Sequence, residues 1–284
     1  MIDLRENIER VTAPGWTGSE TERRAVFDRL RAELNTGSVR AAERGEDGVW
    51  RVNAWVKAGI LLGFRLGRLT RVAGGGWPFF DNDTWPVRSL ELADGVRLVP
   101  GGSSVRDGCY LAPGVVCMPP MYINAGAFVD EDTLVDSHAL IGSCAQIGKR
   151  VHISAGAQIG GVLEPVGELP VIIEDDVLVG GNCGVYEGTI VREGAVLAAG
   201  TILTGSTVVV DLVRDRTWRR AEGRPLEIPA GAVIVPGTRP VRNGPGAAAG
   251  IALATPVIVK YRDERTDAAT RLEELLRATG EIPA

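Results

Sequence analysis

Histidine is scarce in this sequence, which contains only His138 and His152. A catalytic zinc site built from three histidines is therefore excluded unless other ligand types substitute, and we expect no metal. The four cysteines form no CxxC pair and lie at positions Cys109, Cys117, Cys144 and Cys183. Such isolated cysteines favour reduced, buried thiols in a cytoplasmic protein.

Positive charge is also in deficit, with 31 Lys and Arg against 36 Asp and Glu and a net charge of -5. This balance leaves no electrostatic footprint for a phosphate backbone, so we expect no nucleic-acid partner. The uncharged run 108–129 is interrupted by Pro113, Pro119 and Pro120, and it does not suit a membrane span. The first residues lack the apolar core of a signal peptide, and we therefore expect no membrane partner.

The main pattern in the sequence is a six-residue period of aliphatic residues. Aliphatic residues, with one cysteine, recur at Val99, Val105, Leu111, Cys117, Ile123, Val129, Val135, Ile141, Ile147, Ile153 and Ile159, and again at Ile173, Val179, Val185, Val191, Leu197, Leu203 and Val209. A period of six fits neither a helix nor an alternating strand, and it predicts a parallel β-helix with three hexads in each triangular coil. The gap from Ile159 to Ile173 equals two hexads plus two residues.

We expect a mainly β protein with three parts. An N-terminal α/β domain occupies residues 1–95, the β-helix occupies 96–245 with a loop insertion at 160–172, and a C-terminal strand and helix occupy 246–284. The last helix, expected over 266–278, caps the open end of the β-helix, since an uncovered sheet edge invites pairing with other chains.

The N-terminal domain is expected to contain three helices. The first places Leu4 at helical spacing with later apolar residues, the second begins at the cap Ser19 and ends at Gly37, and the third is capped by Asn53. The aromatic segment 74–86 has two interpretations. Either it packs the N-terminal domain onto the first coil, or it forms a wall for a ligand from a neighbouring subunit.

Acyl transfer from a thioester is one chemistry that the repeat can support. His138, beside Asp136, is a possible base for a hydroxyl acceptor, although an exposed or subunit-contact histidine is the simpler interpretation. An amine acceptor needs less help, because a carboxylate can take its proton. Most acidic residues of the repeat are expected at corners that face solvent. The insertion at 160–172 is expected either to cover a groove or a neighbouring subunit, or to be a neutral insertion.

Four stretches carry a family resemblance: 125–136 (AGAFVDEDTLVD), 141–149 (IGSCAQIGK), 151–154 (VHIS) and 159–165 (IGGVLEP). They closely resemble the tetrahydrodipicolinate N-succinyltransferases, which are hexapeptide-repeat acyltransferases. The resemblance implies a left-handed β-helix in a homotrimer with active sites between subunits. It also implies lysine and diaminopimelate biosynthesis, in which the succinyl group of succinyl-CoA moves to the amine of ring-opened tetrahydrodipicolinate.

The resemblance assigns roles to individual residues. Arg97 matches an arginine that binds a substrate carboxylate, Asp136 matches the aspartate at the reacting amine, and Glu164 lies in a loop that contacts substrate. Many members carry a glutamate where this chain has Gly184. Glu187, three residues on, is acidic in those relatives too, and by this comparison it is either a second catalytic carboxylate or a structural residue. Succinyl-CoA, a co-substrate rather than a bound cofactor, is expected along Ala198, Ala199, Gly200 and Lys260.

Two other functions remain open at this point. One is a hexapeptide acyltransferase that uses acetyl-CoA or another amine acceptor. The other is a non-catalytic β-helix scaffold, because a fold does not by itself establish an activity. The scaffold predicts no binding of CoA and no effect of changing Asp136 beyond stability.

Overall fold

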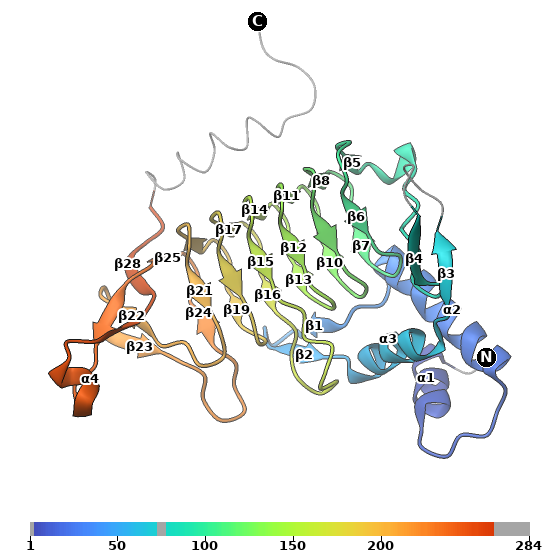
Figure 1. The fold of residues 1–284 in the computed structure, drawn as a ribbon, viewed down its shortest axis with the longest axis horizontal. Helices are drawn as coiled ribbons and strands as arrows, with labels where there is room; N and C mark the ends of the chain where they lie inside the picture. Colours follow the sequence, from blue (N-terminus) through green and yellow to red (C-terminus); the bar gives the residue numbers. More distant parts are fainter. Residues whose placement is uncertain (1–2, 73–77, 264–284) are drawn as a thin grey trace, which may run out of the picture.

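The centre of the molecule is a prism of stacked coils (Figure 1). The computed structural model describes residues 3–72 and 78–263. Each coil contributes one two-residue strand to each of three faces, and neighbouring coils pair in parallel. The predicted parallel β-helix is therefore confirmed, while its left hand remains a prediction from the resemblance. The predicted helix at 266–278 lies outside the described residues.

The chain runs repeatedly from the first face to the second and then to the third. The first face contains β5 (Arg97–Leu98), β8 (Val116–Cys117), β11 (Leu134–Val135), β14 (His152–Ile153), β17 (Leu178–Val179) and β20 (Val196–Leu197). The second contains β6 (Ser104–Val105), β9 (Tyr122–Ile123), β12 (Leu140–Ile141), β15 (Gln158–Ile159), β18 (Gly184–Val185) and β21 (Ile202–Leu203). The third contains β7 (Tyr110–Leu111), β10 (Phe128–Val129), β13 (Gln146–Ile147), β16 (Ile172–Ile173), β19 (Ile190–Val191) and β24 (Glu227–Ile228).

Three edges join these faces. We call the edge between the first and second faces edge A, the edge between the second and third edge B, and the edge between the third and first edge C. Within one coil, edge A includes residues 136–138, edge B includes 142–144 and edge C includes 148–150. Many corner residues adopt positive φ, among them Asp132, His138 and Gly156. Gly, Asn and Asp tolerate this conformation best, which explains why they recur at the corners.

The hexad aliphatics form the core of the prism. In every strand named above except β5 the second residue is buried, and Val135, Ile153 and Val179 stack on one another in successive coils of the first face. Val99 departs from the predicted beat and is not part of this core. Leu98 instead pairs with Cys117, so the step from Leu98 to Val105 is seven positions rather than six. The extra residue is taken up at Gly101 and Gly102, both at positive φ.

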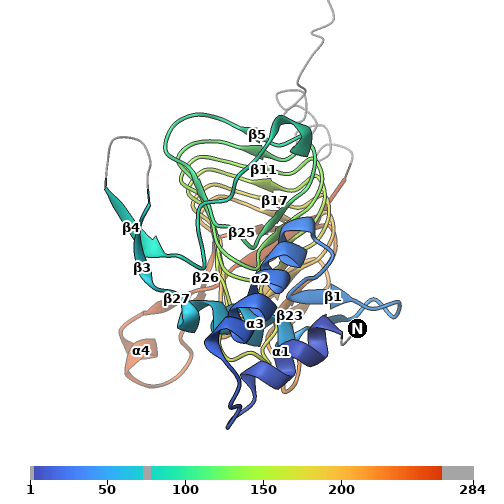
Figure 2. The same cartoon turned by 90° about the vertical axis from the view of Figure 1, so that its right-hand side faces the viewer.

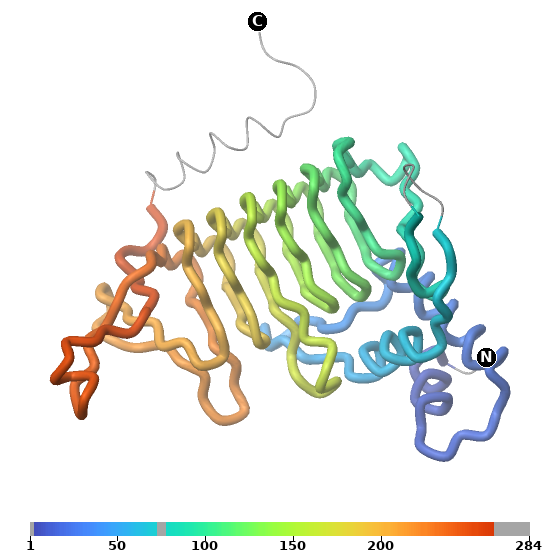
Figure 3. The backbone as a smooth tube through the Cα atoms, viewed as in Figure 1, coloured from blue at the N-terminus to red at the C-terminus, as the bar shows by residue number. Residues whose placement is uncertain are grey.

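The insertion at 160–172 leaves the stack of coils and returns to it (Figure 3). Ile173 pairs with Ile147 on the third face, which is the face directly after that of Ile159. The fourteen residues from Ile159 to Ile173 are therefore one hexad plus eight inserted residues. The period alone suggested two hexads plus two, which would have placed Ile173 on the wrong face.

Three helices lie together beside one end of the prism (Figure 2). They are α1 (Leu4–Thr12), α2 (Glu20–Thr36) and α3 (Ala54–Leu66). The predicted Ser19 cap and Gly37 stop are confirmed, because the Ser19 hydroxyl accepts the Glu22 N–H and Gly37 has φ 73°. Asn53 occupies the N-cap position of α3 as predicted, but its side chain makes no capping bond. Its amide Nδ2 instead donates to the Arg40 carbonyl and joins two segments.

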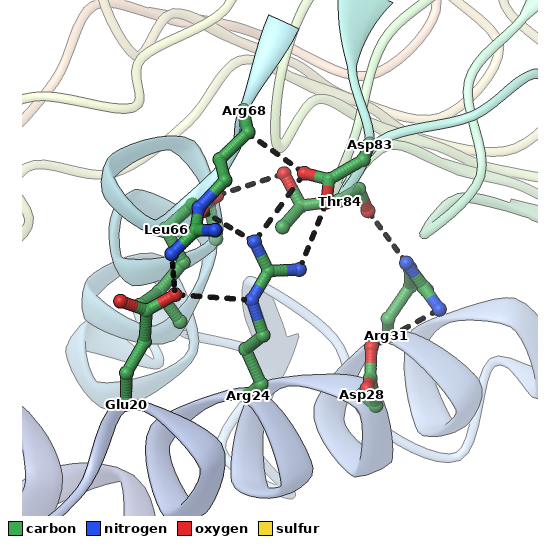
Figure 4. A network of polar contacts seen from close by, with 9 residues as sticks. Glu20, Arg24, Asp28, Arg31, Leu66, Arg68, Asp83 and Thr84 are labelled. Carbon is green, nitrogen blue, oxygen red and sulfur yellow. Dashed lines mark hydrogen bonds and ion pairs between the residues drawn. The ribbon is translucent and has the colours of Figure 1, made fainter. Parts of the chain in front are cut away.

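Helix α2 is tied to the segment that leads into the prism (Figure 4). Arg24 donates to the Leu66 carbonyl at 2.8 Å and pairs with Asp83. Arg31 donates to the Thr84 carbonyl at 2.6 Å. These bonds satisfy the carbonyl of Leu66 at the end of α3 and that of Thr84 just before the first coil. They therefore position the N-terminal helices against the first coils.

The aromatic segment agrees with the packing interpretation at one residue, and the ligand wall stays a prediction. Trp85 is buried, and its ring packs 4.9 Å from that of Phe27, as the packing interpretation predicts. Phe79 and Phe80 are instead mostly exposed on β4. They belong to a hairpin of β3 (Leu69–Val72) and β4 (Phe79–Asn82), which precedes the short helix η1 (Leu92–Asp94). Trp77 lies outside the described residues.

Two further hairpin elements and the C-terminal strands complete the structure. The hairpin of β1 (Ala42–Arg44) and β2 (Trp50–Val52) contacts the third face through Ile172 and Ile190. The first face continues through β25 (Ala232–Val235), β28 (Val257–Tyr261), β22 (Val209–Asp211) and β23 (Arg216–Trp218), and β26 (Thr238–Pro240), α4 (Gly244–Ala248) and β27 (Ala252–Ala254) form a separate projection. Within the described ranges, no helix is both long and apolar enough to cross a membrane.

Candidate active site

Edge A brings Asp136 into line with the expected CoA residues. The backbone N–H groups of Asp136, Ser154 and Gly180 donate to Ile153, Val179 and Leu197, one coil further on in each case. Asp136, Ser154, Gly180 and Ala198 therefore stack in successive coils. With roughly 4.8 Å between coils, Asp136 lies about 14 Å from Ala198 along the edge.

The part of edge A between these residues carries mostly small side chains. Ser154, Ala155, Gly156, Gly180 and Gly181 occupy it with the exposed Asn182, followed by Ala198, Ala199 and Gly200. A Cβ at Gly180 would lie only 2.6 Å from the Leu197 carbonyl oxygen, so the backbone of the next coil leaves no room for one. The result is a strip along which a narrow chain can approach the backbone closely.

Asp136 is half-buried at one end of this strip. Its Oδ1 accepts the Ser137 N–H at 2.6 Å, and the structure records no bond to Oδ2 among the described residues. One carboxylate oxygen is thus held by the backbone while the other remains for a ligand. His138 is exposed, and within the described ranges no hydrogen bond joins it to Asp136.

Arg97 and Lys260 both lie on the first face. Arg97 is exposed on β5, two strands and therefore roughly 10 Å from β11. Lys260 lies on β28, two strands beyond β20, and its Nζ pairs with Asp263 at 3.1 Å. Arg97 is therefore near the Asp136 end of edge A, and Lys260 is near the Ala198 end. A phosphate at Lys260 would compete with Asp263.

Glu164 and Glu187 lie together on edge B. They line an open pocket of about 570 Å³ between the insertion and the corner that follows β18. Tyr186 and Thr204 form its floor, and Arg220 reaches it from the segment after β23 and pairs with Glu168 at 3.3 Å. The structure thus joins two predicted residues in one pocket, and it adds Tyr186, which the sequence interpretation missed.

Glu187 has a structural partner. Its Oε2 accepts the N–H of Gly205 in the next coil at 2.7 Å, which ties two corners together. At the nearby position 184, a Cβ would lie 2.5 Å from the Tyr186 ring. The aromatic ring therefore occupies the space beside Gly184, and a glutamate there would require the ring to move.

Lys57 anchors the insertion from beneath. It lies in α3, its side chain is fully buried, and its Nζ donates to the carbonyls of Pro165 and Glu168 at 3.1 and 2.7 Å. Burial lowers the pKa of this ammonium group. Leu163 of the insertion packs on the same helical cluster. A lone lysine in an apolar helix was the sequence signal for this contact, but the sequence did not identify its partner.

The two groups of residues do not meet within one chain. Edge A carries Asp136 and edge B carries Glu164, and one face separates them. Asp136 is not among the residues that line the pocket at Glu164. No three His, Cys, Asp or Glu residues within 3–72 and 78–263 are grouped so that they could hold a metal ion.

The fold defines a class. Stacked hexads with short corners make this a hexapeptide-repeat β-helix protein. Residues 4–66 match the family model for the N-terminal part of tetrahydrodipicolinate N-succinyltransferase, and residues 170–205 match that for the hexapeptide repeat of succinyl-transferase. These matches confirm the resemblance found in the sequence, at both the helical and the repeat part of the chain.

Named relatives agree with these models. A 2,3,4,5-tetrahydropyridine-2,6-dicarboxylate N-succinyltransferase from Bradyrhizobium diazoefficiens is 45% identical over 134 residues, which cover 45% of this chain and 44% of that protein. The protein of the same name from Chelativorans is 43% identical over 34% of this chain and 35% of its own length. The matched region thus spans less than half of these relatives, which are named as acyltransferase enzymes.

A crystal structure of a Campylobacter jejuni protein titled as a tetrahydropyridine-carboxylate N-succinyltransferase aligns with 87% of this chain and 64% of that chain. Its sequence identity is 16% and its TM-score is 0.46.

Proposed function

We propose that this protein is an acyltransferase that moves the succinyl group of succinyl-CoA to the amine of ring-opened tetrahydrodipicolinate, in lysine and diaminopimelate biosynthesis. The observation that carries the proposal is edge A, where Asp136 stands in line with a strip of small residues ending at Ala198. A pantetheine arm is long, narrow and uncharged, and it suits such a strip. The relatives' names supply the succinyl group and the acceptor.

In the proposed reaction the acceptor amine attacks the thioester carbonyl carbon. Asp136, with one oxygen held by Ser137 and the other open, takes the proton that the amine loses. The carbon–sulfur bond then breaks, and the CoA thiolate leaves and is protonated. Arg97 binds an acceptor carboxylate, for which a planar guanidinium is well suited. Glu164, at the mouth of the pocket on edge B, contacts substrate.

We propose that a second copy of the chain completes the site. Asp136 and Glu164 lie on different edges of one prism, so two copies packed side by side can place edge A of one against edge B of the next. A homotrimer around an axis parallel to the prism repeats this contact three times. CoA then lies along edge A, with Lys260 near its far end.

A direct test follows the release of the CoA thiol by purified protein, with succinyl-CoA or acetyl-CoA as donor and 2-aminopimelate as acceptor. Release that requires succinyl-CoA and acceptor together supports the proposal. Faster release with acetyl-CoA favours the alternative acetyl donor. Absence of release with every pairing, together with no binding of CoA, favours the scaffold.

A second test examines the shared site. Subunits carrying Asp136→Asn and subunits carrying Glu164→Ala are co-expressed with different tags and purified as mixed oligomers. A shared site predicts that mixing two weakly active variants restores activity, because some interfaces then combine two intact edges. If mixed oligomers are no more active than the average of the two variants, the site belongs to a single chain.

We also propose a cytoplasmic location. The four cysteines are free and buried, and burial raises the pKa of Cys109, Cys117 and Cys144 to about 12. Such thiols remain protonated and unreactive, in keeping with a reducing compartment.

A further inference from the structure

A second cavity lies on edge C, beneath the β1–β2 hairpin. It has a volume of about 210 Å³, which is room for about seven water molecules. Its walls come from the N-terminal hairpin on one side and from the corners after β10, β13 and β16 on the other. It shares no lining residue with the pocket at Glu164. The proposed acyl transfer makes no use of it.

Arg40 forms one wall of this cavity and is an unusual cation. Its guanidinium carbon lies 3.6 Å from the centre of the Phe128 ring, and its Nε donates to Gln146 Oε1 at 2.9 Å. Within the described residues, no carboxylate is within ion-pair distance of Arg40. Burial lowers the pKa of its guanidinium, and the more distant carboxylates of Asp130, Glu43 and Asp175 offset this effect only in part. A half-buried charge with no carboxylate close to it is unfavourable, and an anionic group bound in the cavity would correct this.

The opposite wall is acidic. Asp130 and Asp175 each use one oxygen to accept a backbone N–H, from Glu131 and Lys149 respectively, at 2.9 Å. Their second oxygens have no recorded partner among the described residues. Between them on the edge stands Gly148, where a Cβ would lie 2.3 Å from Asp175 Oδ1. The missing side chain keeps the space between the two carboxylates open.

Glu174 also lines the cavity but is already satisfied. It is 6% exposed, accepts from Trp50 Nε1 at 2.8 Å and pairs with Arg192 at 2.7 Å. Burial alone would raise the pKa of Glu174, but these bonds outweigh it and hold that pKa below its usual value. Arg44 also pairs with Glu174, at 3.8 Å. If Glu174 is counted with Arg192, the remaining charged lining residues are Arg40 and Arg44 against Asp130, Asp175 and Glu193, which leaves one excess negative charge.

We propose that this cavity binds a small α-amino acid, with its carboxylate on Arg40 and its ammonium group between Asp130 and Asp175. A simple anion would satisfy Arg40 but would face three carboxylates. A simple cation would satisfy the carboxylates but would leave Arg40 unpaired. A zwitterion satisfies both walls, and the excess negative charge favours one whose side chain is basic.

Isothermal titration of the purified protein, without CoA or acceptor, tests this assignment. The probes are L-lysine, L-alanine and L-glutamate, together with acetate and methylamine, which each carry half of the zwitterion. We expect saturable binding with L-lysine tightest and L-glutamate weakest, by about tenfold or more. Acetate and methylamine should each bind about tenfold more weakly than L-alanine. Acetate binding equal to that of L-alanine would overturn the proposal, as would no binding by any amino acid.

Two variants and a control locate the binding. Arg40→Met keeps an apolar chain on Phe128 and removes the guanidinium, while Asp130→Asn keeps the bond to Glu131 and removes the charge. Both should weaken L-lysine binding about tenfold or more. Arg51→Gln, at an exposed arginine of the same hairpin that pairs with Asp47, should leave it unchanged. If Arg40→Met fails to fold, Asp130→Asn decides alone, and unchanged binding in that variant places the ligand elsewhere and refutes the assignment.

Because the titration contains no acyl donor, its result does not depend on the proposed succinyl transfer. Absence of amino-acid binding together with intact CoA release would refute only the proposed amino-acid site. Loss of CoA release with intact amino-acid binding would refute only the acyl transfer.

Discussion

Replacing Lys57 by methionine tests whether the N-terminal helices position the substrate loop. The change keeps the length and apolar stem of the side chain but removes two hydrogen bonds to the carbonyls of Pro165 and Glu168. Bonds from a charged donor contribute about 1.5–3 kcal/mol each, so the gross loss is about 3–6 kcal/mol. Burying methionine instead of an ammonium group returns part of this loss.

The freed carbonyls belong to Pro165 and Glu168, which are exposed residues and can be hydrated. We therefore expect the free energy of unfolding to fall by only about 1–2 kcal/mol. The loop, by contrast, loses its anchor, and misplaced groups cost catalysis heavily. We expect kcat/KM for succinyl transfer to fall about tenfold or more, with a melting temperature only a few degrees lower.

The assay measures CoA release and chemical denaturation of the same preparations. Lys149→Met is the matched control, because Lys149 pairs with Glu131 on the surface and should change neither quantity appreciably. The reasoning is refuted if Lys57→Met keeps full kcat/KM. It is also refuted if activity falls only in proportion to the unfolded fraction, since the loop would then need no anchor.

Further predictions concern the two edges, Arg97 and pH. Asp136→Asn should lose most activity, whereas Glu187→Gln should keep a substantial part, because glutamine can still accept the Gly205 N–H; the reverse result would overturn both roles. Arg97→Ala should raise the acceptor KM or lower kcat/KM about tenfold or more, and unchanged kinetics would remove it from the site. The pKa of Glu174 is lowered in the folded protein, so this carboxylate stabilises the fold above the unfolded pKa of about 4.5. That stabilisation is lost as the pH falls through the folded pKa. Glu174→Gln should therefore reduce the loss of stability on acidification, which circular dichroism measures. Because the pKa of Lys57 is lowered, the unfolded chain binds more protons between the folded value and about 10.5; stability should therefore rise with pH in that window, and Lys57→Met should remove the rise.

The strands and core of the prism could be predicted from local sequence. Each hexad needs one inward aliphatic residue and a corner that tolerates positive φ, and both requirements are visible as residue types. The six-residue period gave a wrong prediction at one corner. The period placed Val99 in a strand position, but the corner at Gly101 and Gly102 contains one extra residue, and Leu98 pairs with Cys117 instead.

The site was predicted only in part. Asp136 and Ala198 share edge A because coils of constant length return each corner to the same edge. Asp136 and Ala198 stay on the same edge despite the insertion at 160–172, because eight residues of the insertion add no strand. The residue spacing in the sequence did not show how many residues the insertion contains. Three functional residues were missed in the sequence. Lys57 and Arg40 were missed because their hydrogen-bond partners are 106 or more positions away in the sequence. Tyr186 was missed because its role depends on how its ring packs beside Gly184.

The sequence by itself therefore determined the period, the inward residues and the resemblance to a family, because these depend on residue types at fixed spacing. Only the tertiary structure shows which edge each carboxylate occupies and that Lys57 holds the insertion. It also shows that Arg40 lines a cavity with no carboxylate of the described residues within ion-pair distance. The physical reason is that a hydrogen bond or an ion pair depends on distance in space. In a coiled chain, residues far apart in sequence are brought together only when the turns, the insertion and the N-terminal helices are all in place.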